Sequence, residues 1–418
     1  MASFAIPLSG LEASSDALNV ISNNLANLNT DGFKSQNLTF GDIFAQMQGT
    51  SGNGDPIQVG GGVEVNGTVS NFTNGNVAST GIASNMALQG NGFFIVSNNG
   101  QTNYTRNGDF SLNSKGQMVD ANGDLVMGYP ANAAGQVQPG GALAPITVNA
   151  AATLPAQATT NFSITTNLQA DSPVGTTFST PLAIVDSLGE TQNLTITYTN
   201  TATNTWTYNI TLPGAATGAA APTSLANGTL VFNTSGELIT PAESATGTNT
   251  ITGINIAGLV DGAANMSMTW NLNSAVGAPA ITQQDNPSAT TRTSVDGYGA
   301  GTLTGYNVLS NGTVEGTFSN NQTLALGQIA VATFANNQGL SQTNGGDLQA
   351  TTASGAAVIG QAGAGGNGTI TGGAVEESNV DLSTEFSNMI VVQQSYEANA
   401  KSLTTLDQVA QATIQMIT

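Results

Sequence analysis

Asp120, Asn122 and Asp124 have the alternating spacing of the first oxygen ligands in an EF-hand calcium loop. The rest of that loop is missing, because Leu125 stands where the loop needs Gly and Ala131 where it needs a bidentate carboxylate. The Asn-Gly pair at 122–123 is instead typical of a hairpin turn. We therefore interpret the segment as a turn and predict no metal-binding residues.

The absence of Cys and His from all 418 residues removes most other kinds of active site. Ser-His-Asp and Cys-His nucleophile systems, zinc sites with nitrogen or sulfur ligands, and disulfides are all excluded. Any metal would have to be a hard cation held by oxygen atoms. The Gly-rich stretches 60–62, 297–301 and 360–368 lack the GK[ST] sequence of a phosphate-binding loop.

A carbohydrate-active enzyme with paired carboxylates remains an alternative, since Asp and Glu are present. Trp206 and Trp270, however, lie in alternating strand contexts that predict the core or a sheet face rather than a sugar-binding cleft. We predict no catalytic residue and no cofactor, and therefore a protein that is not an enzyme.

The chain is acidic chiefly because it has few bases. Five Lys and Arg stand against 25 Asp and Glu, for a formal net charge of −20. The bases are scattered singly, which argues against nucleic acid and anionic membranes as partners; they are Lys34, Arg106, Lys115, Arg292 and Lys401. No apolar run is long enough for membrane insertion, and residues 1–10 lack the pattern of a Sec signal.

The elements that could organise this chain are two helices, one at each end. Near the N-terminus, apolar residues recur every seven positions with a second heptad position filled three residues on; the two sets are Phe4, Leu11, Leu18 and Leu25, and Ser14, Ile21 and Leu28. A capping box of Ser9 and Glu12 predicts one position for the start of this helix. The alternative is an earlier start at Ser3, which would place Pro7 in the first turn, where proline is tolerated. Residues 29–32 offer the stop.

The C-terminal stripe is longer. Its two heptad sets are Leu382, Met389, Tyr396, Leu403, Ala410 and Ile417, and Phe386, Val392, Ala400, Leu406 and Ile414. Ser378 with Asp381 is the expected cap. A helix of nearly forty residues would be roughly 55 Å long at 1.5 Å per residue. Because such a helix outruns a small domain, its best partner is the other terminal helix, although packing on a globular core is the alternative.

Between the helices the pattern is that of short strands and turns, with Gly at 51 positions. The expected fold class is mainly β with terminal α-helices, in a nested multidomain plan. Residues 1–33 and 378–418 form a helical coiled-coil domain, joined by linkers 34–75 and 358–377. An inner β domain covers 76–146 and 285–357, and a sandwich or barrel at 147–284 is inserted into it as an outer domain.

Both ends resemble the bacterial flagellar rod and hook axial protein family. The run NNLANLNTDGFK (23–34) and the segment SNVDLSTEFSNMIVVQQSYEANAKSLTTLDQ (378–408) match its paired signatures, although Gln394 stands where the family usually carries Arg. The motif residues are Asn24, Ala26, Asn27, Asn29, Thr30, Gly32, Phe33, Lys34, Asn379, Asp381 and Leu382. The central segments 58–81, 90–110, 178–199 and 326–340 make the chain most similar to the hook members.

The resemblance implies a structural subunit of the flagellar hook, which polymerises into a flexible tube that couples rod torque to the filament and encloses an export channel. Its implied partners are copies of itself, the rod, hook-cap and hook-filament junction proteins, and the type III export apparatus, with an extracellular location. Helix pairing and subunit contacts are expected at Leu11, Leu18, Ile21, Leu25, Leu28, Leu382, Phe386, Met389, Tyr396, Leu403 and Leu406.

Two other interpretations stay open: a distal rod or junction-type axial subunit, and a secreted β-rich adhesin or surface-layer protein. The second would not need matched heptad helices at the two termini. We also expect residues 1–33 and 378–418 to be mobile before assembly, because a free subunit covers little of their apolar surface.

Overall fold

The computed structural model describes residues 4–43, 46–50, 56–241, 249–273, 279–343 and 345–417. The chain forms two compact units. The first comprises Met1–Ala150, Gly305–Thr317 and Thr323–Thr418, and the second comprises Ala151–Thr304 with Phe318–Gln322. The second unit is therefore inserted into the first along the chain. The expected fold class, mainly β with a helix at each end and several domains, is confirmed.

The two terminal helices both belong to the first unit. Helix α1 spans Ala5–Ala26, and helix α3 spans Leu382–Ile417, a length of 36 residues. Pro7 lies in the first turn of α1, where its missing N–H costs no hydrogen bond. No helix in the described ranges is both long and apolar enough to cross a membrane.

The predicted capping box at the start of α1 is wrong. The helix begins at Ala5, near the alternative start at Ser3, so Ser9 and Glu12 lie inside it. The Ser9 hydroxyl donates back to the carbonyl of Ile6 at 2.9 Å, as hydroxyls do within a helix. The S-x-x-E pattern of Ser9 and Glu12 therefore lies within the helix and does not mark its start.

Two other terminal predictions also need correction. Helix α1 ends at Ala26, before the predicted stop at 29–32. At the start of α3 the cap is Asp381 itself, whose Oδ1 accepts the backbone N–H of Thr384 at 2.7 Å. Ser378 lies outside the helix and accepts instead from the N–H of Val380.

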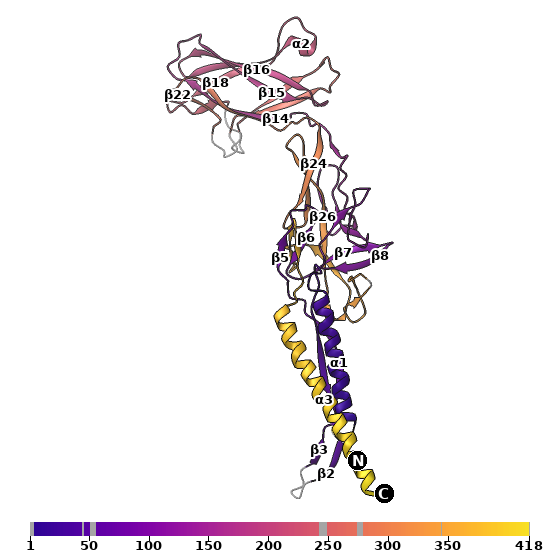
Figure 1. Cartoon of the computed structure of the whole chain (residues 1–418). Helices are drawn as coiled ribbons and strands as arrows, with labels where there is room; N and C mark the ends of the chain where they lie inside the picture. Colours follow the sequence, from indigo (N-terminus) through magenta and orange to yellow (C-terminus); the bar gives the residue numbers. More distant parts are fainter. Residues whose placement is uncertain are drawn as a thin grey trace. The chain divides into compact units, whose positions relative to one another are not determined.

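Helices α1 and α3 lie side by side and antiparallel (Figure 1). Asn24 hydrogen-bonds to Glu385, and Gly10 lies against Asn399, so the two contacts are fourteen residues apart on each helix. By this register the first residue of α1, Ala5, is opposite Thr404. The last three turns of α3 therefore extend past the beginning of α1.

The segment after α1, expected as a linker with short strands, contains paired strands. Strand β1 (Gln36–Asp42) pairs antiparallel with β4 (Val63–Ser70), and this ribbon packs on α1. Strands β2 (Gln46–Thr50) and β3 (Pro56–Val59) also pair antiparallel. Much of the 34–75 segment is thus ordered hairpin rather than irregular linker.

The β core of the first unit is built from short strands in the order β25-β26-β11-β7-β8-β28-β27. Strands β10 and β12 also pair with β11, and β9 pairs with β10. Phe93 packs edge-to-face against Phe72 and Phe334 at its centre, with ring centroids 5.7 and 5.9 Å away. A short 3₁₀ helix spans Asn337–Gly339. The strands are β7 (Phe93–Asn98), β8 (Gln101–Thr105), β9 (Ser111–Leu112), β10 (Met118–Val119), β11 (Leu125–Pro130), β12 (Ala144–Pro145), β25 (Thr313–Phe318), β26 (Thr323–Thr333), β27 (Ser341–Gln342) and β28 (Leu348–Gln349).

The Gly-rich segment before α3, expected to be a flexible linker at 358–377, is also built into the first unit. Strand β29 (Val358–Gln361) pairs with β26, and β30 (Thr369–Gly372) pairs with β6 (Met86–Gln89). Strand β31 (Ala374–Glu376) pairs with β5 (Val77–Ser79). Backbone pairing holds this segment where its composition alone predicts flexibility.

The second unit is a sandwich of two five-stranded sheets around a shared core. Trp206 and Trp270 are fully buried in that core, which is one of the two placements, core or sheet face, predicted from their strand contexts. One sheet has the order β15-β16-β17-β18-β19, from the strands β15 (Thr177–Val185), β16 (Thr191–Ala202), β17 (Thr205–Leu212), β18 (Thr223–Phe232) and β19 (Leu238–Thr240). The other has the order β20-β21-β14-β22 with β23 also on β14, from β14 (Asn161–Gln169), β20 (Thr250–Ile256), β21 (Met266–Asn271), β22 (Ile281–Gln284) and β23 (Ala289–Val295).

The second unit extends beyond the boundary predicted at 284. The Asn, Pro and Ser-rich residues after Gln284 form the turn from β22 to β23, and both strands pair with β14. The chain then continues into β24 (Gly301–Val308), whose first residues pair with β13 (Thr153–Leu154). A single turn of helix, α2 (Gly214–Thr217), completes the unit.

Candidate functional site

The face of α1 that is buried in the subunit carries small residues. Ala13, Ala17 and Ile21 are each 7% exposed or less. The heptad residues Leu11, Leu18 and Leu25 of α1 are half-buried, as is Leu28 in the turn after the helix. Of the predicted contact residues near the N-terminus, the structure thus encloses Ile21 and leaves the four leucines partly open.

Gly10 of α1 lies directly against Asn399 of α3. A Cβ atom there would lie 2.7 Å from the side-chain nitrogen of Asn399 on α3, closer than atoms approach without movement. The Ser14 hydroxyl donates to the carbonyl of Gly10 at 2.7 Å, so it forms its hydrogen bond within α1. Small residues therefore let α3 lie directly on the backbone of α1.

Helix α3 is largely open to solvent. Met389 and Leu403 are half-buried in the part of α3 that pairs with α1, and Leu406 is half-buried just beyond it. The other predicted contact residues are exposed: Leu382 by 44%, Phe386 by 50% and Tyr396 by 37%. Pairing with α1 thus covers one side of α3 and leaves much of its apolar surface bare.

Near the end of α1, the motif residue Asn24 joins three segments of the chain. Its Nδ2 donates to Glu385 of α3 and to the carbonyl of Gln36, both at 2.9 Å, and its Oδ1 accepts from the N–H of Gln36 at 2.9 Å. Asn24 is 1% exposed and Glu385 is 6% exposed. This amide therefore fixes the end of α1, the start of β1 and the first turn of α3 together.

Asn379 has the matching role on the C-terminal side. Its Oδ1 accepts from the N–H of Ser35 at 2.8 Å, and its Nδ2 donates to the carbonyls of Asn71 and Thr73. A residue of the C-terminal signature thus hydrogen-bonds to three backbone groups of the N-terminal segment.

The remaining motif residues form the turn that follows α1. Asn27 Nδ2 donates to the carbonyl of Asn23, and the Thr30 hydroxyl donates to Asn27 Oδ1. Ala26 and Asn29 are exposed, and Phe33 is half-buried. Gly32 has φ +70°, and a Cβ there would lie 2.5 Å from the carbonyl carbon of Arg106, so both its conformation and its contact favour glycine.

Two of the five basic side chains meet on one buried carboxylate. Lys34 Nζ lies 2.6 Å from Glu376 Oε1, and Arg106 Nη1 lies 3.4 Å from Glu376 Oε2. Arg106 also donates to the carbonyls of Leu88 and Gly90. Burial lowers the pKa of Lys34 and that of Arg106, against the opposing effect of Glu376 on both. Two of the bases that look scattered along the sequence thus form a buried cluster with Glu376, which we call the Glu376 ion cluster.

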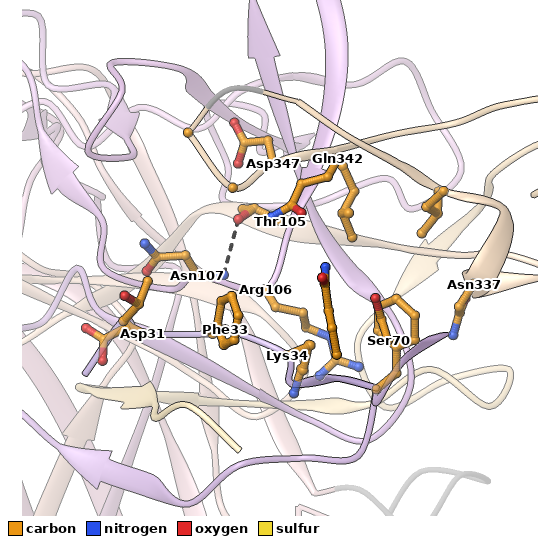
Figure 2. A pocket seen from close by; sticks show the side chains of 18 of the residues that line it. Asp31, Phe33, Lys34, Ser70, Thr105, Arg106, Asn107, Asn337, Gln342 and Asp347 are labelled. Carbon is orange, nitrogen blue, oxygen red and sulfur yellow. Dashed lines mark hydrogen bonds between the residues drawn. The ribbon is translucent and has the colours of Figure 1, made fainter. Parts of the chain in front are cut away.

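A cavity of about 450 Å³ opens beside this cluster (Figure 2). It is lined by the loop after α1, by Arg106 and Asn107, and by Asp120 and Asp347. Asn107 donates its backbone N–H to the Thr105 hydroxyl at 3.2 Å. Burial, with the nearby Asp120 carboxylate, raises the pKa of Asp347 to about 6.

Sequence reasoning missed Arg106, Glu376 and Glu385 as members of this junction. Arg106 lies in the YTRNGDF segment and Glu376 shortly before α3, so no local pattern links them. The only available signal was the small number of bases, five Lys and Arg in the whole chain. A buried Lys or Arg is normally paired with a carboxylate, but the sequence does not show which bases are buried.

Models of known families match four stretches of the chain. The flagella basal body rod protein model covers residues 6–34, and the flagellar hook protein FlgE/F/G D1 domain covers 87–167. The flagellar basal body protein FlaE D2 domain covers 153–298, and the C-terminal model of the flagellar basal body rod FlgEFG proteins covers 371–416. These matches define an axial subunit of the flagellar rod and hook class.

Full-length relatives narrow the class. The chain is 36% identical over 428 residues to flagellar hook protein FlgE of Salmonella typhimurium, covering 99% of this chain and 100% of the relative. It is 31% identical over 446 residues to the protein of the same name from Borreliella burgdorferi, covering 98% of each. The chain therefore belongs to the flagellar hook protein family, as a structural subunit of the hook.

A solved structure shares the fold. The crystal structure of Helicobacter pylori flagellar hook protein FlgE2 matches with a TM-score of 0.53 at 13% identity, covering 70% of this chain and 98% of that chain.

Proposed function

We propose that copies of this chain polymerise into a flexible helical tube in which the paired terminal helices form the inner layer around an export channel. The tube couples the torque of the rod to the filament. The observation that carries this proposal is the apolar surface that α3 leaves bare in the subunit: Phe386 is 50% exposed, Ile390 55% and Val391 61%.

This surface has the pattern of a helix-packing face. Leu382, Phe386 and Ile390 recur at intervals of four, so they lie along one side of α3. That side adjoins the face that α1 covers. A second helix placed there would remove these side chains from water, and full burial of one such side chain contributes about 1.5–3 kcal/mol.

The end of α3 supplies a second contact. Beyond Thr404 the helix has no α1 residue opposite it, and Val409, Ile414 and Met416 are 52, 63 and 85% exposed. A helix segment of about three turns gains little stability in water from its own backbone hydrogen bonds. Contact with a neighbouring copy would bury these residues and stabilise the helix end.

The other partners follow from membership of the family. We infer that the tube joins the rod at one end and hook-filament junction proteins at the other, that it grows beneath a hook cap outside the cell, and that subunits reach it through the type III export apparatus. The chain has no Cys, so unfolding for export requires no disulfide reduction. The function is structural, with no reaction for the chain to catalyse.

Assembly of a variant tests the proposal. The double variant Phe386→Ser, Ile390→Ser should keep the fold of the subunit, because both side chains already face solvent, but should raise the critical concentration for polymer in a sedimentation assay at least tenfold. Val174→Ser is the matched control, since Val174 is 69% exposed in the second unit. Unchanged assembly of the double variant would refute this face as the contact.

A further inference from the structure

Three buried carboxylates meet in the first unit. Asp120 and Asp124 lie on the turn between β10 and β11, and Asp347 lies just before β28. One oxygen of each carboxylate lies within 4.8 Å of those of the other two. The three residues are only 6, 4 and 3% exposed. More than 220 residues of sequence separate Asp347 from the other two, so the EF-hand spacing of Asp120 and Asp124 gave no sign of this third carboxylate.

We propose that Asp120, Asp124 and Asp347 bind a divalent cation, with Ca²⁺ the favoured ion. The turn prediction for residues 120–124 holds, since Gly123 has φ +86° and its N–H donates to the carbonyl of Asp120. Asp120 Oδ1 accepts the backbone N–H groups of Asn122 and Asp124, at 2.9 and 2.8 Å. Because both bonds end on Oδ1 of Asp120, its Oδ2 is not used to hold the turn and can bind the cation.

A buried amide beside the carboxylates has an oxygen without a hydrogen-bond partner. Asn103 is 8% exposed, and its Oδ1 is buried without a hydrogen-bond partner in the part of the chain that the structure describes. Asn103 and Thr105 are two residues apart on β8 and so share a face. Asn103 hydrogen-bonds to Asp124, and Thr105 to Asp347, so this face points into the carboxylate cluster.

The amide of Asn103 can supply a further oxygen ligand. Rotation of the carboxamide by half a turn exchanges Nδ2 for Oδ1, and the two orientations are assigned from their surroundings rather than from shape. With an ion bound between the carboxylates, the oxygen would face the ion and lose its orphaned state. Three carboxylates and one amide oxygen are the kind of ligand that Ca²⁺ takes.

No base neutralises the three carboxylates. Both ion pairs found among the described residues end on Glu376, where Lys34 and Arg106 are engaged. Lys115, the nearest base in the sequence to Asp120, is exposed. Buried charges ordinarily need a partner. A divalent cation would supply the positive charge that this chain, with its five bases, does not.

An ion can reach the cluster from outside. Asp120 and Asp347 both line the cavity of about 450 Å³ that opens beside the Glu376 ion cluster. Figure 2 shows Asp347 at this cavity. Ca²⁺ accepts six to eight oxygens in irregular arrangements and can fill the remaining positions with water from the cavity, whereas Mg²⁺ requires a near-ideal octahedron. Bound Ca²⁺ would tie the turn before β28 to the β10–β11 turn.

Calorimetric titration of the chelator-treated full chain with CaCl₂ tests the proposal. We expect one site per chain with a dissociation constant on the order of 10⁻⁴ to 10⁻³ M, typical of extracellular calcium modules. Asp347→Asn should weaken Ca²⁺ binding at least tenfold. Asp109→Asn removes an exposed carboxylate of the same unit and should bind as the original chain does.

Asn103→Ala gives a second variant that changes no charge, and it should also weaken binding, which nonspecific attraction of Ca²⁺ to an acidic protein would not produce. Circular dichroism would establish that each variant is folded. Absence of binding by the folded original chain at 10 mM Ca²⁺, or equal binding by Asp347→Asn, Asn103→Ala and Asp109→Asn, would overturn the proposal. All of these measurements use unpolymerised protein, so they do not depend on the outcome of the assembly test.

Discussion

Lys34 Nζ lies 2.6 Å from Glu376 Oε1, although 342 residues separate the two in sequence. The pair joins the segment after α1 to the segment before α3. Glu376 Oε1 also accepts the N–H of Gly75 at 2.8 Å, and Arg106 reaches Oε2. One carboxylate thus fastens the N-terminal and C-terminal parts of the first unit to each other.

Replacement of Glu376 by Gln should destabilise the first unit by about 3–5 kcal/mol, because Lys34 and Arg106 would stay buried without a counter-charge. The unfolding of the two units in urea can be followed by separate signals. Helical circular dichroism reports on the first unit, which contains α1 and α3, and Trp fluorescence reports on the second unit, which contains both Trp residues. The helical transition should move to lower urea while the Trp fluorescence transition stays in place. Glu377→Gln, at the exposed neighbour, is the control. Equal effects of the two substitutions would contradict a buried ion cluster.

Asn24→Ala should cost about 2–3 kcal/mol in the same helical transition. The substitution leaves the Gln36 backbone groups and the buried Glu385 carboxylate without their partner. Asn19→Ala, on the exposed side of the same helix, should change the transition by less than about 0.5 kcal/mol. If both variants unfold alike, Asn24 does not join the helices as described.

The second unit offers a prediction about pH. Backbone and side-chain hydrogen bonds from Thr160 and Asn161 to Asp296 outweigh the effect of burial and hold the pKa of Asp296 below its ordinary value of 3.8. A lowered pKa stabilises the fold above pH 3.8, and this stabilisation disappears as the pH falls through the folded-state pKa. Asp296→Asn should therefore cost about 1 kcal/mol at pH 7. The cost should shrink as the pH falls below 3.8, as measured by unfolding followed with Trp fluorescence; a cost that is no smaller at pH 2.5 than at pH 7 would contradict the assignment.

Hydrogen exchange should divide α3 at Thr404. In the monomer, residues 405–417 have no α1 residue opposite them and should exchange much faster than 385–400, whereas in polymer both parts should be protected. Mass spectrometry of peptides from the two states measures this. Core-like protection of 405–417 in the monomer would show that the helix end needs no neighbouring subunit.

The helices could be predicted from the sequence because each carries a long, regular apolar repeat. Leu382, Met389 and Leu403 are spaced by multiples of seven, and few structures other than a helix use that period. Helix ends were less predictable, since an S-x-x-E pattern such as Ser9 to Glu12 also occurs within helices. Which residue caps a helix depends on the backbone conformation just before it. At the start of α3, Asp381 and not Ser378 accepts a free N–H group of the first turn.

The junction and the domain boundary could not be predicted for a different reason. Lys34, Arg106 and Glu376 come from three distant segments, and only the pairing of strands such as β5 with β31 brings them together. Likewise, the turn after Gln284 has the composition of a linker, and its role depends on the pairing of β22 and β23 with β14. Local patterns carry no information about such long-range pairings.

The central claim is that subunits assemble through the terminal helices, and a helical reconstruction by electron microscopy of polymer grown from the purified chain tests it most directly. The account predicts tubes whose innermost layer is α1 and α3, with Phe386 and Ile390 buried against a neighbouring copy. Tubes whose lumen is lined by the β-rich units, or helices that contact no neighbour, would contradict it.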